Sequence, residues 1–381
     1  MLDVVTPEPQ VLFEERTTAS GHVVGFARLN APKSLNALSL TMIRLLDEQL
    51  RRWDEDPNVA CVVLHGTGDK AFCAGGDVRS LHRAIKDEGP SPTNAMALAF
   101  FSEEYRLDYR IHRYSKPVIA WASGIVMGGG LGLLAGASHR VVTETSRIAM
   151  PEITIGLFPD VGGSWFLRRM PGKMGLFVAL TGVSLNASDA KTARLADHFL
   201  LCSQFQTMCD RLREASWQSS ATHNRATVSQ ILTTLAIACV ASMPESNLQR
   251  HATLIDSMCG GSDLGQIVAR IAGYDGTDQW LQRAAKTLAG GSPTTMALIW
   301  ALRNRAESLS LADVFRLELT VAMQCCAHPD FAEGVRALLI DKDGRPSWTP
   351  QRLDEVSSAW LAEHFREPQW PHAHHPLHDL N

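Results

Sequence analysis

Two glycine clusters and one glycine-bounded run constrain this chain more than any other feature of its sequence. The clusters are Ala74-Gly-Gly-Asp77 and Met127-Gly-Gly-Gly130, and the run Met150 to Gly163 carries Glu152 and Asp160. Glycine lets main chain approach a ligand where a Cβ would obstruct it. Backbone N–H groups fixed in advance can stabilise a developing oxyanion. The pattern predicts an oxyanion pocket with two carboxylates beside it.

Each of these features also has a simpler interpretation when it is taken alone. Glycine clusters are common in tight turns, and most glutamates are solvated. Glu152 is flanked by apolar residues, so we expect it to be desolvated, with a raised pKa. Asp160 precedes Val161-Gly-Gly163, where an aspartate is a frequent helix N-cap. The residues alone leave the capping role and the catalytic role of Asp160 both open.

The hydrophobic pattern predicts an α/β core. Ser39 is a plausible N-cap for a helix, and buried strands are expected at 23–29, 59–65, 118–122 and 140–143. Strands and helices alternate to about residue 200, which by itself indicates a doubly wound parallel sheet. Residues 1–203 are therefore expected to form the core that holds the pocket.

The rest of the chain is expected to be helical. Residues 204–291 are helix-prone and are interpreted as a helical insertion, and residues 292–381 as a C-terminal helical region with a polar tail. The tail, residues 371–378, is rich in histidine. Its prolines and its place at the chain end favour a frayed segment over a metal site, and no metal site is predicted elsewhere.

Composition limits the partners and the compartment. The net charge of −4 and the scattered basic residues provide no broad footprint for nucleic acid. Residues 118–137 carry no charge, but glycines interrupt them, so no membrane span is expected. Eight cysteines without a C-x-x-C pair indicate reduced thiols. With no targeting segment apparent at the N-terminus, a cytoplasmic protein is expected.

The motifs resemble those of the enoyl-CoA hydratase/isomerase (crotonase) superfamily. The resemblance is carried by Lys70-Ala-Phe-Cys-Ala-Gly-Gly-Asp77, by the triplet Gly128 to Gly130 and by Met150-Pro-Glu152. It extends from about residue 25 to about residue 364. The resemblance implies a crotonase-like spiral of strand-strand-helix repeats with a helical C-terminal region, in place of a doubly wound sheet.

The resemblance also implies roles for the site residues. The N–H groups of Gly76 and Gly129 would hold a thioester oxygen, and Glu152 corresponds to a catalytic acid/base. Asp160 stands where hydratases usually have glycine, whereas Gly132 stands where hydratases carry their second catalytic glutamate. An aspartate at position 160 is similar to the superfamily's hydrolase branch, and glycine at position 132 leaves the hydratases' pair of carboxyls incomplete. The resemblance therefore implies hydrolysis in place of hydration.

Further residues are assigned to the substrate by resemblance. Glu104 matches a substrate-binding position, although its helical context alone equally predicts a surface charge. Lys33, Leu35 and Ala37 belong to a segment that would lie near the CoA ribose phosphate. The backbone of Cys73 and Ala74 would face the adenine, and Phe331 and Lys342 would close the pocket from the C-terminal region. An isolated lysine is more often a solvated surface residue. Coenzyme A enters as part of the substrate, and no other cofactor is implied.

The expected activity is hydrolysis of a short-chain acyl-CoA thioester, with 3-hydroxyisobutyryl-CoA favoured because Phe158 to Gly163 and Phe331 to Asp343 are similar to that branch. One alternative is an enoyl-CoA hydratase or isomerase. Another is a non-catalytic CoA-binding protein of the same fold. The expected partner is an acyl-CoA, and the C-terminal helices allow a homo-oligomer.

Overall fold

The strands of the chain form two sheets. A computed structural model describes residues 8–372 and 374–381. The larger sheet has the order β1-β2-β3-β5-β7-β9 and the smaller sheet has the order β4-β6-β8. The strands are β1 Val11–Thr17, β2 Val23–Leu29, β3 Val59–Gly66, β4 Ala71–Cys73, β5 Val118–Ala122, β6 Ile125–Met127, β7 His139–Val142, β8 Arg147–Ala149 and β9 His198–Phe199.

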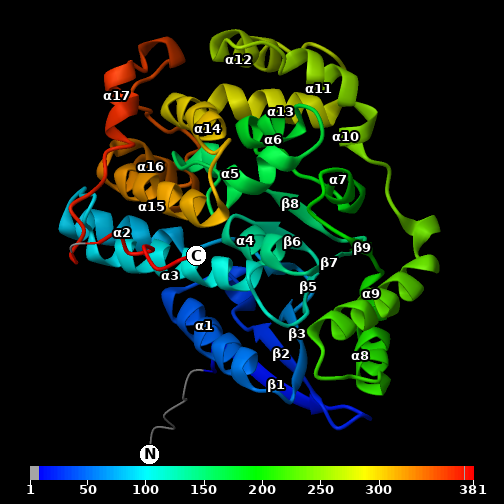
Figure 1. The fold of residues 1–381 in the computed structure, drawn as a ribbon. Coiled ribbons are helices and arrows are strands. Elements are labelled where there is room, and N and C mark those ends of the chain that lie inside the picture. The colour runs from blue at the N-terminus through cyan, green and yellow to red at the C-terminus, as the bar shows by residue number, and fades with distance from the viewer. Residues whose placement is uncertain (1–7, 373) are drawn as a thin grey trace, which may run out of the picture.

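The order of the elements produces a spiral. The strands β3, β5 and β7 enter the larger sheet, and each is followed by a strand of the smaller sheet, β4, β6 or β8. Helices then return the chain to the start of the next turn (Figure 1). Apart from the antiparallel pair β1 and β2, neighbouring strands are parallel. The strand-strand-helix repeat implied by the motifs is confirmed, and the doubly wound sheet is not formed.

The helices of the spiral lie around the two sheets. They are α1 Leu40–Glu55, α2 Val78–Glu88, α3 Ala95–His112, α4 Gly129–Gly136, α5 Gly163–Phe166, α6 Met174–Thr181 and α7 Ala187–Thr192. Ser39 caps α1 as predicted, because its hydroxyl accepts a hydrogen bond from the Met42 N–H at 3.1 Å. Helix α3 packs against α1, α4 and α15, and it carries several of the site residues described below.

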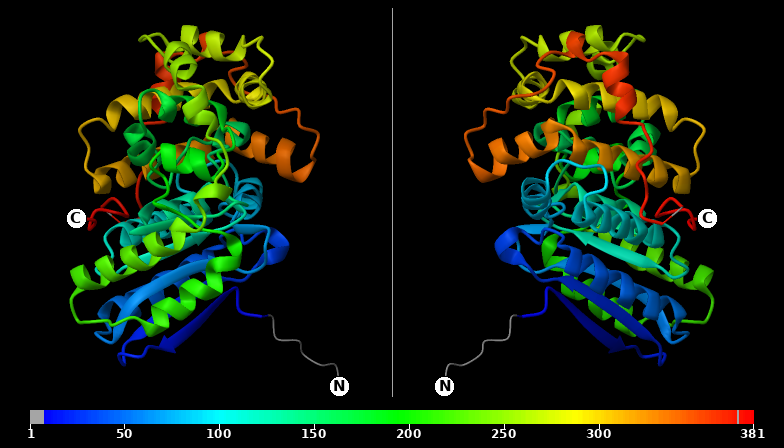
Figure 2. Two further views of the ribbon diagram at one scale, coloured as in Figure 1. Left: turned by 90° about the vertical axis from the view of Figure 1, so that its right-hand side faces the viewer. Right: turned by 90° about the vertical axis from the view of Figure 1, so that its left-hand side faces the viewer.

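Residues 204–291 form helices that pack in two separate places. The helices are α8 Phe205–Glu214, α9 Ala221–Ile237, α10 Asn247–Arg250, α11 Ala252–Met258, α12 Leu264–Ala272 and α13 Gln279–Gly290. Helix α9 contacts β3 and β9 of the larger sheet, whereas α10, α11 and α13 contact α6 or α7. Figures 1 and 2 show this separation. The division of the chain into three segments stays a prediction.

The C-terminal region wraps back onto the spiral. It contains α14 Pro293–Arg305, α15 Leu311–Ala327, α16 Pro329–Val335, a π-helical turn Arg336–Ile340 and α17 Ser358–Glu363. Helix α15 packs along α3, and α16 packs against α2. Sequence far from the core thereby reaches the same region as the glycine clusters.

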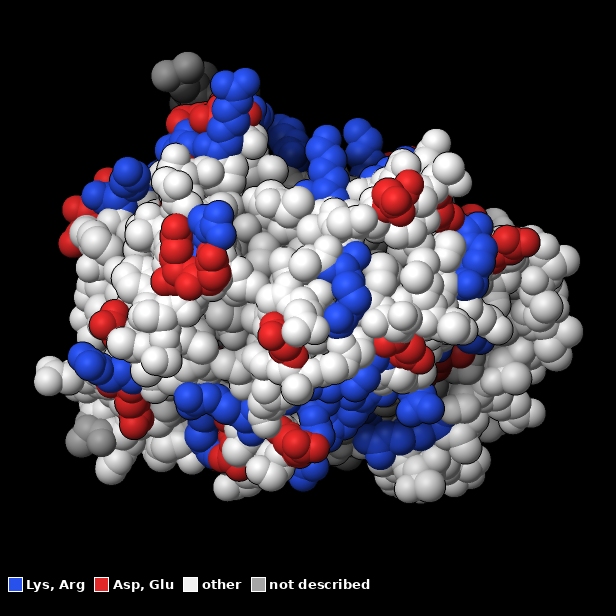
Figure 3. Space-filling model, turned by 90° about the horizontal axis from the view of Figure 1, so that it is seen from above, with Lys and Arg blue, Asp and Glu red and all other residues white. Residues whose placement is uncertain are grey.

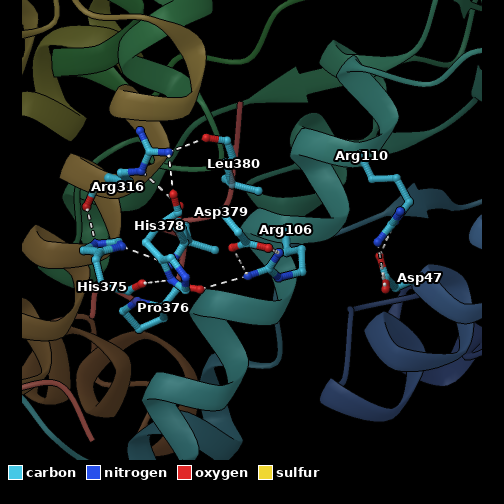
Figure 4. Close-up of polar contacts among 10 residues, drawn as sticks. Asp47, Arg106, Arg110, Arg316, His375, Pro376, His378, Asp379 and Leu380 are labelled. Atoms are coloured by element: carbon cyan, nitrogen blue, oxygen red, sulfur yellow. Dashed lines mark hydrogen bonds and ion pairs between the residues drawn. The ribbon is translucent and has the colours of Figure 1, made fainter. Parts of the chain in front are cut away.

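The prediction of a frayed polar tail is wrong for the residues described there. Leu377 is fully buried, and Asp379 accepts two hydrogen bonds from the Arg106 guanidinium at 2.7 and 2.8 Å. Arg316 of α15 donates to the carbonyl oxygens of Leu377 and Leu380 (Figure 4). The tail is fixed because its backbone carbonyls and one carboxylate meet arginines of α3 and α15, and its leucines fill apolar space.

Other expectations concern features outside the core. No helix of the described residues is long and apolar enough to cross a membrane, and all eight cysteines are free. The same residues hold no group of three or more His, Cys, Asp or Glu side chains arranged to bind a metal ion. Basic and acidic side chains are interspersed on the face shown in Figure 3. The first seven residues, where no targeting segment was expected, lie outside the described residues.

Candidate active site

A cavity of about 210 Å³ lies where the two glycine clusters meet the run from Met150 to Gly163. The clusters follow β4 and β6, neighbouring parallel strands of the smaller sheet, so both emerge at the same edge. The other walls come from α3, from the 3-10 turn Glu152–Ile155 and from the π-helical turn. The lining includes Gly76, Gly129, Glu104, Glu152 and Asp160. Residues placed together by the sequence hypothesis therefore share one cavity.

Two residues that line this cavity have unpartnered backbone donors. Gly129 is the first residue of α4, so its N–H has no partner within that helix. Neither this N–H nor that of Gly76 has a hydrogen-bond acceptor among the described residues. A Cβ at Gly129 would overlap the carboxylate oxygen of Glu104. The two N–H groups form a pair of free donors, as an oxyanion pocket requires.

Glu152 begins a 3-10 turn and is buried. Its Oε2 atom is shielded from solvent and has no hydrogen-bond partner among the described residues. Burial, and then the nearby Asp160, raise the pKa of Glu152 well above its usual value. The apolar flanks in the sequence indicated this desolvation. Glu152 is thus a desolvated carboxyl with an unpartnered oxygen, and it lines the cavity.

The side chain of Asp160 is held by a tyrosine and caps no helix. Asp160 Oδ2 accepts a hydrogen bond of 2.7 Å from the hydroxyl of Tyr105, and both residues are buried. Burial raises the pKa of Asp160 to about 6, although the Tyr105 hydrogen bond acts to lower it. Of the two interpretations left open by the sequence, the side-chain N-cap is wrong.

Glu318 of α15 caps the start of α5 instead. Its carboxylate oxygens accept hydrogen bonds from the N–H groups of Gly162 at 2.7 Å and Ser164 at 2.8 Å. Val161, which lies between Asp160 and Gly162, has a φ of 51°, which is rare for a β-branched residue. The cap therefore holds a strained loop, and this loop carries Asp160.

The cavity is rich in carboxyls and lacks cationic side chains. None of the described residues that line it is a lysine, arginine or histidine. Burial and the neighbouring Asp160 raise the pKa of Glu104 well above its usual value. Asp108, one turn further along α3, is fully buried, and burial followed by the Glu104 charge raises its pKa in the same way. Burial therefore favours the neutral, protonated form of Glu104 and Asp108.

The predicted CoA segment lies beside a second cavity of about 340 Å³. Lys33 and Leu35 line it, together with Lys70. The Ala74 N–H donates to the Leu35 carbonyl oxygen at 3.0 Å, and Ala74 lines the first cavity, so the two cavities are adjacent. Ala37 and Cys73 line neither of these two cavities.

The two residues expected to close the pocket do not line it. Phe331 belongs to α16 and is fully buried, and Lys342 is exposed with a φ of 58°. Leu338 and Leu339 of the π-helical turn reach the cavity in their place. The distal segment contributes as the resemblance implied, but through leucines, because the π-turn directs their side chains toward the cavity.

Sequence reasoning missed three residues that shape the site: Tyr105, Asp108 and Glu318. Asp108 follows Tyr105 by three residues and Glu104 by four, so it is a neighbour of both on the surface of α3. That spacing is a signal that could have identified Asp108. Glu318 is more than 150 positions from the loop that it caps, and nothing in its local sequence indicates the contact.

A spiral of this kind, with two free backbone donors opposite buried carboxyls, defines the crotonase class of enzymes. The chain belongs to the enoyl-CoA hydratase/isomerase family, whose model matches residues 24–365.

Relatives and solved structures agree with this assignment. A protein of Danio rerio named "3-hydroxyisobutyryl-CoA hydrolase, mitochondrial" is 39% identical over 357 residues, covering 93% of this chain and 89% of the relative. The protein of that name from Xenopus tropicalis is 38% identical, covering 90% and 86%. The structure of a carnitinyl-CoA dehydratase from Mycobacterium thermoresistibile matches with a TM-score of 0.79 and 32% identity, covering 96% of this chain and 99% of that one.

Proposed function

We propose that this chain hydrolyses a short-chain acyl-CoA thioester, with 3-hydroxyisobutyryl-CoA as the preferred substrate and 3-hydroxyisobutyrate and CoA as products, a step of valine breakdown. The names of the relatives from Danio rerio and Xenopus tropicalis support this substrate. The observation that carries the proposal is the pair Glu152 and Asp160, which line one cavity with the free N–H groups of Gly76 and Gly129.

The two N–H groups would bind the thioester carbonyl oxygen. Attack on the carbonyl carbon places negative charge on this oxygen, and donors fixed in advance stabilise that charge at little cost in reorganisation. Removing one such donor from an enzyme typically costs about 100 to 1000-fold in kcat. Glu104 borders the same donors, where its carboxyl would contact the bound acyl group.

Glu152 and Asp160 would share one proton. Near neutral pH Asp160 carries the negative charge and Glu152 carries the proton, because the Tyr105 hydrogen bond favours ionisation of Asp160 alone. The site thereby offers one base and one acid at the same pH. Such an arrangement suits a reaction in which a nucleophile must lose a proton and a leaving group must gain one.

The covalent route begins when Glu152 passes its proton to Asp160. The Glu152 carboxylate attacks the carbonyl carbon, and the C–S bond breaks as an anhydride C–O bond forms. Asp160 returns its proton to the CoA sulfur. Water then attacks the acyl carbon of the anhydride and gives a proton to Asp160, which hands it back to Glu152 as the acid product leaves. In the direct route, Glu152 also passes its proton to Asp160 first and then takes a proton from the water that attacks the carbonyl carbon. The C–S bond breaks, Asp160 gives its proton to the CoA sulfur, and no anhydride forms.

A trapping experiment separates the two routes. The enzyme is quenched with hydroxylamine during turnover, and the peptide that carries Glu152 is analysed by mass spectrometry. A hydroxamate at Glu152 indicates the anhydride. Turnover without a hydroxamate indicates direct attack by water.

The rival hydratase activity is disfavoured at Gly132. Syn hydration needs two carboxyls to position one water and move its proton, and the residue at the second position is glycine in this chain. A thiol-release assay over a panel of acyl-CoA esters, run beside a hydration assay with a short enoyl-CoA, tests the proposal. Thioester cleavage without hydration is expected, and the reverse result would contradict it. No activity with any ester would favour the non-catalytic binding protein.

The remaining expectations also belong to this proposal. The eight free cysteines support a reducing compartment such as the cytoplasm, whereas the relatives' names place those proteins in mitochondria. We propose that the enzyme needs no cofactor besides the CoA that enters as part of the substrate. A metal chelator should therefore leave the activity undiminished. Light scattering of the purified protein would determine whether it forms a homo-oligomer.

A further inference from the structure

Asp160 is surrounded by groups that are acidic or neutral. Those that face it come from α3, from the turn at Glu152 and from α15, and they are Glu104, Tyr105, Asp108, Glu152, Glu318 and Cys325. None of them is a cation. Among the residues that the structure describes, no neighbouring positive charge therefore explains how one carboxyl of this cluster ionises in preference to the others.

Hydrogen bonding does distinguish Asp160 from the other carboxyls of the cavity wall. Its Oδ2 accepts the Tyr105 hydroxyl at 2.7 Å. In contrast, Glu104 Oε1 and Glu152 Oε2 have no partner among the described residues. A hydrogen bond donated to a carboxylate stabilises the charged form. The negative charge is therefore expected to settle on Asp160.

The surroundings of Tyr105 fix its hydroxyl. Tyr105 is fully buried, and its ring packs between Phe101 and Phe315, with centroids 5.9 and 5.8 Å away. A ring held in this way cannot turn its hydroxyl toward solvent. The hydroxyl is aimed at the loop that carries Asp160.

We propose that Tyr105 is a positioning residue of the active site, which holds Asp160 as the carboxylate of the site and orients it toward the cavity while Glu104 and Glu152 keep their protons. This inference rests on the proposed thioester hydrolysis. It assigns to Tyr105 no contact with the substrate. The direction of the pKa values agrees, since the pKa of Asp160 rises only to about 6 while those of Glu104 and Glu152 rise well above their usual values.

The matched pair of variants Tyr105→Phe and Tyr109→Phe tests the inference. Tyr109 lies one turn further along α3 and packs against the same Phe315 ring, at 6.0 Å. No hydrogen bond of its hydroxyl is recorded among the described residues. The dependence of kcat/KM on pH is measured for the parent and both variants between pH 5 and 9.

Loss of the Tyr105 hydroxyl should move the acidic limb of the profile upward. A hydrogen bond to a charged group corresponds to about one to two pH units of displacement. Tyr105→Phe should therefore lose roughly tenfold or more of its activity at pH 6.5, in kcat with little change in KM, and regain most of it at pH 8.5. Tyr109→Phe should retain the parent profile. An acidic limb that stays in place in Tyr105→Phe, or moves equally in both variants, overturns the inference.

If Tyr105→Phe does not fold, a second measurement on the parent protein still tests the inference. The parent protein labelled with carbon-13 at the aspartate carboxyls is titrated by NMR, and Asp160→Asn identifies the Asp160 signal. The inference expects this carboxyl to titrate near pH 6, ahead of Asp108, and simultaneous titration of the two would contradict it. A parent enzyme without thioesterase activity would contradict the proposed function, and this titration would still test the relation between Tyr105 and Asp160.

Discussion

The carboxyl group of Asp108 lies against Gly132. Its Oδ2 and Oδ1 atoms are 2.8 and 2.9 Å from the position that a Cβ would take at Gly132, and the Cβ of Val161 is 2.8 Å from the same position. Both oxygens of Asp108 are buried without a hydrogen-bond partner among the described residues. A glutamate cannot be accommodated at position 132 while Asp108 and Val161 keep these places. The departure from the hydratase pattern is therefore built into the packing of α3 against α4.

Gly132→Ala should destabilise the protein. Alanine in a helix interior normally stabilises by roughly 0.5–1 kcal/mol relative to glycine, but the new methyl group would overlap Asp108 and Val161, and overpacking typically costs about 1–3 kcal/mol. Urea unfolding measures the difference. Gly290→Ala in α13 is the control, because its Cβ would meet nothing within 4 Å. A Gly132→Ala protein as stable as the parent would contradict the packing argument.

Much of the fold could be predicted because its main strands are continuous apolar runs. Strands β2 and β5 begin and end where the pattern placed them, and β3 extends one residue further. The strands of the smaller sheet have three residues each, which is too short for any periodicity to be detected. Their existence followed only from the resemblance. The ordered tail was missed because its contacts are made by carbonyl oxygens, which any sequence possesses.

The residues of the candidate site that could be predicted are those that lie within short sequence motifs. Glu152 and Gly129 lie in such motifs, and both line the cavity. The partner of Asp160 could not be predicted, because Tyr105 lies 55 positions earlier and an aromatic residue on an apolar helix face normally indicates packing. Long-range contacts between side chains depend on how the helices cross, and a single sequence does not specify those crossings.

Glu152→Gln should abolish most turnover while CoA still binds. The substitution keeps the shape of the side chain and removes its ability to ionise or to transfer a proton, and positioned acid/base groups typically contribute about 100 to 10,000-fold. Steady-state kinetics and calorimetric titration with CoA measure the two effects. Glu103→Gln, at the surface of α3 where Glu103 pairs with Arg44, should leave both unchanged. Near-native turnover in Glu152→Gln would remove the residue from the mechanism.

Gly129→Ala should lower kcat even though alanine favours helices. The added Cβ would overlap Glu104 Oε1 and lie 3.3 Å from Leu38 Cδ1, so the N–H of residue 129 must move away from the oxyanion position. We expect a loss of about 100 to 1000-fold, the usual effect of removing one oxyanion donor. Circular dichroism and urea unfolding show whether the variant is folded. Normal hydrolysis by a folded Gly129→Ala protein would place the carbonyl oxygen elsewhere.

Leu377→Ala should destabilise the protein although it lies four residues from the chain end. The side chain is fully buried, and truncating a buried leucine typically costs about 2–5 kcal/mol. Thermal and urea unfolding measure the loss. The exposed Asn381→Ala variant is the control and should match the parent. Equal stability of the parent and both variants would mean that the tail does not contribute to stability, as expected of a frayed segment.

The buried carboxyls predict how stability depends on pH. An acid whose pKa is raised by folding binds more protons in the native state than in the unfolded state, so stability falls as pH rises from its unfolded pKa toward its folded pKa. Histidines whose pKa is lowered by burial have the opposite effect, so that stability rises with pH up to about pH 6.5. Burial lowers the pKa to about 4 for His65, His112, His139 and His364. The two effects oppose each other in acid.

Above pH 7 those histidines are neutral in both states, and the carboxyls with the highest pKa values remain. Burial raises the pKa of Glu318 to about 8 and that of Asp108 well above its usual value. Stability should therefore decrease between pH 7 and 8, by up to about 1.4 kcal/mol per pH unit for each such group. Asp108→Asn removes one of them without entering the cavity wall, so its free energy of unfolding should fall less steeply over this interval. Urea unfolding at pH 7, 7.5 and 8 compares the two proteins, and parallel slopes would mean that Asp108 is ionised in the native state at neutral pH.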